Sequence, residues 1–176
     1  MQVTADSATD QEIAEAADYF SRLKPRARAR IIESLQVPRT EAAVGLYVRS
    51  TAGGDEPLGG RIIEVPVDAA RHDLRDSQVR YLAYVPPGSV ERGRRIATMG
   101  TDGGQACAAC HGADLRGTAL APPIAGRSPS YLLRQLIGFK IGTRATAAAA
   151  SMQAIAGWLG LDEMVAVAAY AGSRAP

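Results

Sequence analysis

Two cysteines and one histidine stand together in this sequence and form its most reactive group of side chains. They occur in the run Cys107-Ala-Ala-Cys110-His111, and the chain contains no other cysteine. Two thiols at this spacing can each add across a vinyl group of one haem, and the histidine that follows can bind the iron. The run therefore predicts one covalently attached haem c, held by Cys107 and Cys110, with His111 as an iron ligand.

The same residues could instead serve as a redox dithiol or as part of a zinc site. A thioredoxin-type Cys-x-x-Cys lies where a strand meets a helix in a βαβ unit, and no such alternation surrounds residue 107. A zinc site needs four ligands, and His72 is the only histidine besides His111. The polar neighbours of His72 indicate a surface residue rather than a second iron ligand. Haem attachment is favoured over a dithiol, a metal site and a chance match.

The composition resembles that of a soluble globular protein with a thin core. Hydrophobic residues make up 47% of the 176 residues and charged residues 22%, but only 5% are aromatic. A buried porphyrin would fill the space that so few aromatic side chains leave. The net charge of +2 is too weak to indicate nucleic acid or anionic lipid as a partner. No apolar run approaches the length of a membrane span, so membrane association is not indicated.

Residues 1–20 lack the basic start and apolar stretch of an export signal. Covalent haem is normally attached outside the cytoplasm, so the attachment motif predicts a periplasmic protein. The two expectations agree if the natural chain begins upstream of Met1.

An internal repeat supports that interpretation. At an offset of 151 (152 − 1), six residues of the N-terminal stretch recur near the C-terminus: Met, Gln, Ala, Glu, Ala and Tyr at 1/152, 2/153, 5/156, 12/163, 17/168 and 19/170. We interpret residues 1–24 as the C-terminal remnant of an upstream haem domain. The alternative is that two Ala-rich amphipathic helices resemble each other by composition.

The elements that must position the motif follow from local patterns. Residues 8–23 read as a helix, and short β-branched runs at 30–33, 61–65 and 79–85 predict two or three strands within a linker over 25–88. After Pro86-Pro87-Gly88, Ser89 is expected to be the N-cap of a helix over 90–99. A helix that opens at Ser128 or Ser130 should run to about Lys140, and a final helix covers about 161–171.

Taken together, these features resemble the class I cytochromes c, and most closely the C-terminal half of a two-haem periplasmic cytochrome c. The resemblance covers about 89–174, with 1–20 as the tail of a preceding unit. It is carried by the order of Gly93, Cys107-Ala-Ala-Cys110-His111-Gly112, Pro122-Pro123-Ile124-Ala125-Gly126-Arg127, Tyr131-Leu-Leu-Arg-Gln-Leu136, Gly142-Thr-Arg144, Met152 and Tyr170.

The resemblance implies a mainly α fold, in which a helical cytochrome c domain over 89–176 follows a small irregular β-containing segment and an N-terminal helix. It implies that His111 is the proximal iron ligand and that Pro123 lies in the loop whose carbonyl accepts the hydrogen bond from the His111 ring. Met152, in a loop, would be the distal ligand. Arg144 would neutralise a haem propionate, or be a solvated surface arginine.

The resemblance also implies that Gly93 and Tyr170 lie where the first and last helices of the domain cross closely. Among the four methionines, Met152 alone follows His111 in a weakly patterned segment, whereas Met164 falls on the apolar face of the last helix. A core position is therefore expected for Met164.

The function that follows is single-electron transfer between periplasmic redox partners, by a carrier that is not itself an enzyme. A His/Met-ligated iron has no open position for a substrate. The partners expected are a respiratory complex, a dehydrogenase or a terminal oxidase. Two alternatives remain: a cytochrome subunit of a dehydrogenase or oxidase complex with 25–88 as its interface, and a haem enzyme with an open distal site.

Overall fold

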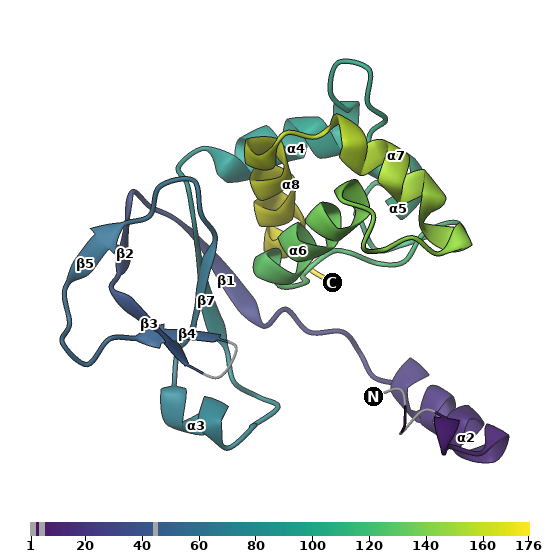
Figure 1. The fold of residues 1–176 in the computed structure, drawn as a ribbon, viewed down its shortest axis with the longest axis horizontal. Helices are drawn as coiled ribbons and strands as arrows, with labels where there is room; N and C mark the ends of the chain where they lie inside the picture. The colour runs from purple at the N-terminus through teal and green to yellow at the C-terminus, as the bar shows by residue number, and fades with distance from the viewer. Residues whose placement is uncertain (1–2, 4–5, 44–45) are drawn as a thin grey trace.

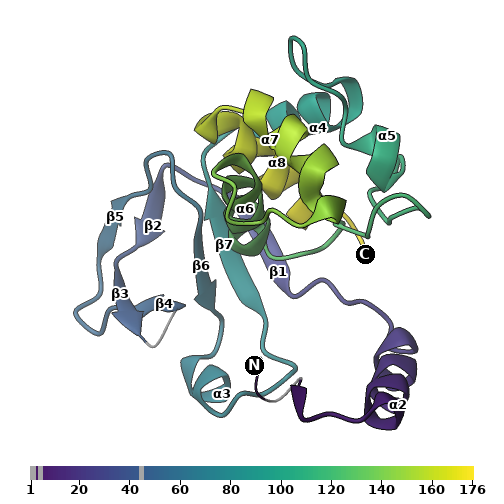
Figure 2. The same ribbon diagram turned by 45° about the vertical axis from the view of Figure 1, so that its right-hand side comes forward.

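The computed structural model describes residues 3, 6–43 and 46–176. It consists of an N-terminal helix, a β-containing segment and a C-terminal helical domain (Figures 1 and 2). This order confirms the predicted fold class.

The helical domain is organised around the last helix of the chain. Helix α8 (Leu161–Ser173) packs against α4 (Ser89–Met99), against α6 (Pro129–Lys140) and against strand β1 (Ala29–Glu33). Smaller elements complete the domain, namely α5 (Ala108–His111), the 3₁₀ turn η1 (Ala147–Ala149) and α7 (Ala150–Trp158). Every residue from Met164 to Gly172 is buried, so α8 forms the centre of the domain.

The close crossing of α4 and α8 depends on Gly93. A Cβ atom at this position would clash with the backbone carbonyl of Ala166 and lie 2.8 Å from the Cβ of Tyr170. Only a residue without a side chain lets the two helices approach this closely, which outweighs the helix propensity that glycine lacks. The expected contact between Gly93 and Tyr170 is confirmed.

The first turn of α4 is capped from another part of the chain. Ser89 was expected to be the N-cap, but it is the first helical residue and is buried, and Gly88 occupies the cap position with a φ of +78°. The backbone N–H of Val90 donates instead to the Glu33 carboxylate, at 2.8 Å. The prediction for Ser89 is wrong because Gly88 has no side chain to cap with and a strand supplies the acceptor.

The β-containing segment holds three small sheets rather than two or three strands. The largest has the order β1–β7–β6, in which β7 (Tyr81–Val85) pairs parallel to β1 and antiparallel to β6 (Ile63–Pro66). Two further pairs are antiparallel: β2 (Gln36–Pro38) with β5 (Asp55–Pro57), and β3 (Thr40–Ala43) with β4 (Leu46–Arg49). A short helix, α3 (Ala69–Asp73), links β6 to β7. The strand count predicted from the sequence is therefore too low.

This segment has a core of its own and is also fastened to the helical domain. Its core consists of Val37, Leu58, Ile63, Val65 and Tyr84, apart from the apolar clusters of the helices. At its border the Glu64 carboxylate accepts hydrogen bonds from the Ser128 hydroxyl (2.9 Å) and the Ser130 backbone N–H (2.8 Å). Glu33 and Glu64 thus satisfy backbone N–H groups at the starts of α4 and α6, which helices cannot satisfy internally.

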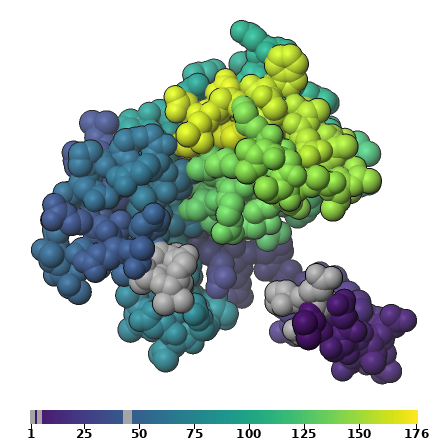
Figure 3. All heavy atoms as spheres, viewed as in Figure 1, coloured from purple at the N-terminus to yellow at the C-terminus, as the bar shows by residue number. Residues whose placement is uncertain are grey.

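The N-terminal helix α2 (Asp10–Ser21) forms as predicted but has no buried residue. The apolar side chains Ile13 and Phe20 of this helix are 52% and 66% exposed. Figure 3 shows α2 as a lobe set apart from the rest of the molecule on this face. Met1, Gln2 and Ala5, three of the positions in the repeat, lie outside the described residues.

Among the described residues, no single helix is both long and apolar enough to cross a membrane. That test of length and composition is met only by two helices taken together, Ala147–Trp158 and Leu161–Ser173, with a bend of 118° between them.

Candidate haem site

The two cysteines lie on one short turn of helix. Cys107 precedes α5, and its carbonyl accepts the backbone N–H of His111 at 2.9 Å, so one turn of helix carries both cysteines and the histidine. The side chain of Cys107 packs on the apolar cluster that contains Ala97 and Leu115. Burial raises the pKa of the Cys107 thiol, which keeps it protonated at neutral pH.

The ring of His111 is buried and held in one orientation. Its Nδ1 lies 2.7 Å from the carbonyl oxygen of Pro122. A carbonyl can only accept, so Nδ1 carries a proton, and in the neutral form of the ring Nε2 is the nitrogen that can bind a metal. An axial histidine is commonly fixed by such a backbone acceptor.

The accepting carbonyl belongs to the loop that the resemblance named. Pro123 lies in this loop, as expected, but the carbonyl belongs to Pro122. Gly117, with a φ of +87°, makes the geometry possible, because a Cβ there would lie 2.7 Å from the Pro123 nitrogen. The Thr118 hydroxyl, which sequence reasoning missed, donates to the Cys110 carbonyl at 2.6 Å and ties the same loop to the cysteines.

Met152 lies in the first turns of α7 and is half-buried. The expectation of a loop at this position is wrong, because the alanine-rich approach has high helix propensity and forms η1 followed directly by α7. In both views α5 and the start of α7 lie on the same side of the helical domain (Figures 1 and 2). Of the other described methionines, Met164 is buried in the core, as expected, and Met99 is 71% exposed.

Arg144 is exposed and rests on α6. Its guanidinium group lies 4.5 Å from the centre of the Phe139 ring and donates to the Gln135 side chain at 2.8 Å. Both contacts hold the guanidinium group in place beside α6. The structure thus leaves the propionate role of Arg144 as a prediction.

His72 lies away from this site, on α3. Its Nδ1 is 3.0 Å from the Tyr81 hydroxyl, and the ring is half-buried. Among the described residues, no group of three or more His, Cys, Asp and Glu side chains is placed to hold a metal ion.

The side chains present fit a covalent haem. Two cysteines lie within one turn of helix of a buried histidine, whose side-chain hydrogen bond among the described residues uses Nδ1 and not Nε2, and one thiol borders an apolar cluster. A haem bound there would extend that cluster and supplement a core that has few aromatic residues.

Comparison with known proteins places the C-terminal domain in a family. Residues 90–173 match the family model for cytochrome c. A thiosulfate dehydrogenase electron acceptor from Stutzerimonas stutzeri (strain A1501) is 43% identical over 81 residues, which are 44% of this chain and 36% of that protein.

Solved structures extend the likeness. Thiosulfate dehydrogenase from Marichromatium purpuratum aligns with 97% of this chain at 28% identity and a TM-score of 0.57, although that stretch is 26% of its own length. Cytochrome c4 from Acidithiobacillus ferrooxidans aligns with 48% of this chain and 49% of its own, at 33% identity and a TM-score of 0.45. The first alignment includes the β-containing segment as well as the helices.

The chain spans about a third of the length of its curated relative and about a quarter of the dehydrogenase. The family match confirms the resemblance that the attachment motif carried. Residues 90–173 belong to the cytochrome c family, and the cofactor of this domain is covalently bound haem c.

Proposed function

We propose that this chain passes single electrons between a thiosulfate dehydrogenase and a second redox partner in the periplasm, as a carrier subunit rather than as the enzyme. The relative named as an electron acceptor carries this proposal, because its 43% identity to this chain extends over 81 residues, nearly the length of the haem domain. The dehydrogenase structure supports it, because its likeness covers almost the whole chain. Haem c supplies the one-electron Fe(III)/Fe(II) chemistry when bound.

The protein's own contribution is to hold the haem ligands rigidly. The Pro122 carbonyl fixes the tautomer and direction of His111, and the Thr118 hydroxyl ties the cysteine turn to the same loop. A site fixed in this way reorganises little between oxidation states, which favours fast electron exchange.

The partner can be tested with the isolated holoprotein. Ferric holoprotein mixed with a thiosulfate dehydrogenase and thiosulfate should become reduced, at a rate that rises with the concentration of the dehydrogenase. Thiosulfate without the dehydrogenase is the control. Failure of several such dehydrogenases to reduce the holoprotein, in a preparation that a chemical reductant does reduce, would contradict the proposal.

We further propose that Met152 is the distal ligand. The ferric holoprotein should then show the long-wavelength absorption band of iron–thioether ligation, and Met152→Ala should abolish it and admit carbon monoxide to the ferrous form. Met99→Ala is the matched control, because Met99 is 71% exposed on α4. Carbon monoxide binding to the unmodified protein would favour the open-site haem enzyme instead.

A last proposal is that α2 is the final helix of a second haem domain. Three positions of α2 and α8 correspond at the offset of 151: the N-caps Thr9 and Gly160, the glutamates Glu12 and Glu163, and the tyrosines Tyr19 and Tyr170. The apolar face of α2 is exposed, whereas that of α8 is buried. Mass spectrometry of the native protein should find two haems; a mass with one haem and no further domain would contradict this.

A further inference from the structure

A positively charged hollow borders the loop that holds His111. Its volume is about 160 Å³, and its lining comprises Arg26, Arg116 and Arg127 together with proline, alanine and glycine residues, Pro123 among them. One buried water needs roughly 10–15 Å³, so the hollow admits a considerably larger ion. None of the lining side chains is a carboxylate, although Pro176, the last residue of the sequence, also lines the hollow.

The three arginines come from separate parts of the chain. Arg26 precedes β1, Arg116 follows the attachment motif, and Arg127 precedes α6. Arg26 donates to the Gln78 side chain at 3.1 Å, and Arg116 donates to the Ala175 carbonyl at 3.3 Å. Each of these two guanidinium groups is thus anchored by a neutral acceptor, which orients it without neutralising its charge.

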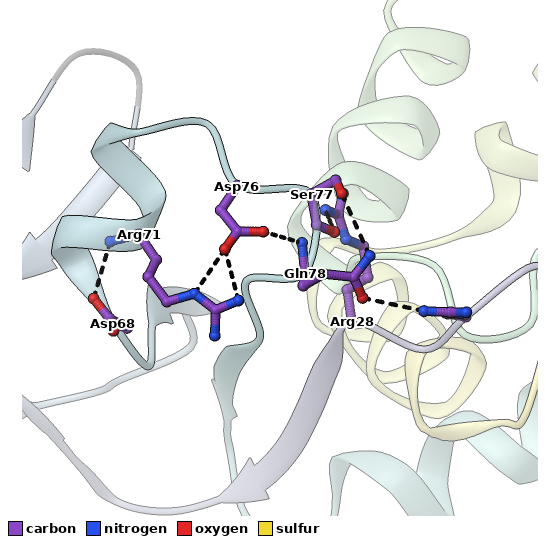
Figure 4. A network of polar contacts seen from close by, with 7 residues as sticks. Arg28, Asp68, Arg71, Asp76, Ser77 and Gln78 are labelled. Atoms are coloured by element: carbon purple, nitrogen blue, oxygen red, sulfur yellow. Dashed lines mark hydrogen bonds and ion pairs between the residues drawn. The ribbon is translucent and has the colours of Figure 1, made fainter.

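The segment that carries Arg26 is held by the network drawn in Figure 4. Arg28, two residues further on, donates to the Ser77 carbonyl, and the Asp76 carboxylate accepts the Gln78 backbone N–H at 2.7 Å. Asp76 is held in turn by Arg71, at 2.6 Å. The position of Gln78, and through it that of Arg26, is therefore set by the β-containing segment.

The side chains that line the hollow carry an excess of positive charge. Among the described residues, none of these three arginines forms an ion pair within 4.0 Å. Like charges brought to one hollow repel one another, although solvent screens part of this repulsion because all three arginines are exposed. Guanidinium groups bind oxyanions in two-pronged hydrogen bonds, so an oxyanion relieves the repulsion and uses their donors.

We propose that this hollow is a binding site for a divalent tetrahedral oxyanion of the sulfate class. The site lies next to the proximal side of the haem, because Pro123 lines it and the adjacent Pro122 carbonyl accepts from His111. A negative charge there favours the ferric state. The bound anion therefore lowers the haem potential, and the ferric protein binds it more tightly than the ferrous protein. This coupling rests on the proposed redox role, whereas the site itself does not.

The test is calorimetric titration of the holoprotein with sodium sulfate, in a buffer of low ionic strength free of sulfate and phosphate. We expect saturable binding of one sulfate per chain, with sodium chloride at equal ionic strength giving none. The double variant Arg116→Gln/Arg127→Gln should bind sulfate at least tenfold more weakly. Arg39→Gln/Arg49→Gln is the matched control, because it removes the same charge from exposed positions of the β-containing segment.

Three results would overturn the site: no saturable binding, the same response to chloride, or equal losses in the two double variants. Melting curves without sulfate show whether each variant is folded. A redox titration with and without saturating sulfate tests the coupling separately, and each tenfold preference for the ferric form corresponds to about 59 mV. Unchanged potential with intact sulfate binding would overturn the coupling alone.

Discussion

Helices α2 and α8 begin in the same way and end in different surroundings. In both, a glutamate at the third helical position accepts the N-cap backbone N–H at 2.8 Å, from Thr9 to Glu12 and from Gly160 to Glu163. Both carry a tyrosine seven residues after that glutamate. Yet Tyr170 is 7% exposed and Tyr19 is 61% exposed.

This difference in burial separates the properties of a helix that are local from those that need a partner surface. Capping and helix propensity act within a few residues and form both helices. Burial needs a partner surface, which α8 finds in α4, α6 and β1 and which α2 lacks within the described residues. Most of the stability of a helix comes from such packing. Changes at matched positions of the two helices should therefore differ in effect wherever packing matters.

The largest effect is expected where α8 meets α4. Gly93→Ala places a methyl group against the Ala166 backbone and the Tyr170 side chain, neither of which can move aside alone, and should destabilise the holoprotein by at least about 3 kcal/mol. Gly157→Ala, on α7, meets no atom within 4 Å and should be neutral or stabilising. Urea unfolding measures both. Equal effects would show that α4 and α8 do not cross as described.

The tyrosine pair tests burial directly. Tyr170→Ala removes a buried ring and should cost about 3–5 kcal/mol, whereas Tyr19→Ala should change the unfolding free energy by less than about 0.5 kcal/mol. In a longer protein with the second haem domain proposed above, Tyr19→Ala should become as costly as Tyr170→Ala. A small effect there would show that α2 has no such partner.

A smaller effect is expected where the β-containing segment covers the helical domain. Glu64→Ala leaves the Ser130 N–H without its acceptor and should cost about 2–3 kcal/mol. Glu56→Ala removes a carboxylate whose one ion pair among the described residues is with the half-exposed Arg61, and it should cost less than about 1 kcal/mol. If the cap at Glu64 fastens the segment, hydrogen exchange in the first turn of α6 should also quicken. Unchanged exchange would contradict that role.

The smallest effect concerns the capping interaction at the start of α2, which has a counterpart at the start of α8. The backbone N–H of Thr9 lowers the pKa of Glu12 below its usual 4.5. Because the folded pKa is the lower one, the cap contributes fully above the unfolded pKa and is lost as pH falls through the folded pKa. The Thr9 amide signal should report this titration by NMR, and Glu12→Gln should remove it. A Thr9 signal that stays constant through acid pH would contradict the cap.

The sequence allowed the helices of the haem domain to be predicted because their signals are local. Ser128 caps α6 as expected, and α8 begins at Leu161 as expected. The four strands β2 to β5 were missed, since they are three or four residues long and show no alternation of apolar and polar residues. Each of these strands forms only because a turn or loop places its partner strand beside it.

Apart from the crossing at Gly93 and Tyr170, which the resemblance implied, the contacts between distant parts of the chain could not be predicted. Glu33 caps a helix 57 residues away and Glu64 one 66 residues away, and neither has a sequence pattern that names its partner. In the candidate site, the resemblance identified the proline loop but not the accepting carbonyl, which depends on the course of the backbone past Gly117. The convergence of Arg26, Arg116 and Arg127 likewise arises only in the folded chain.

The parallel pairing of β1 and β7 has a mechanical consequence. Because the strands run in the same direction, a pull between the start of β1 and the end of β7 loads all their ladder hydrogen bonds at once, in shear, instead of opening them one at a time. Strand β7 leads directly into α4, and β1 follows the segment joined to α2. Tension between the two ends of this segment is therefore borne by the whole ladder of hydrogen bonds, which resists any stretching between α2 and the helical domain.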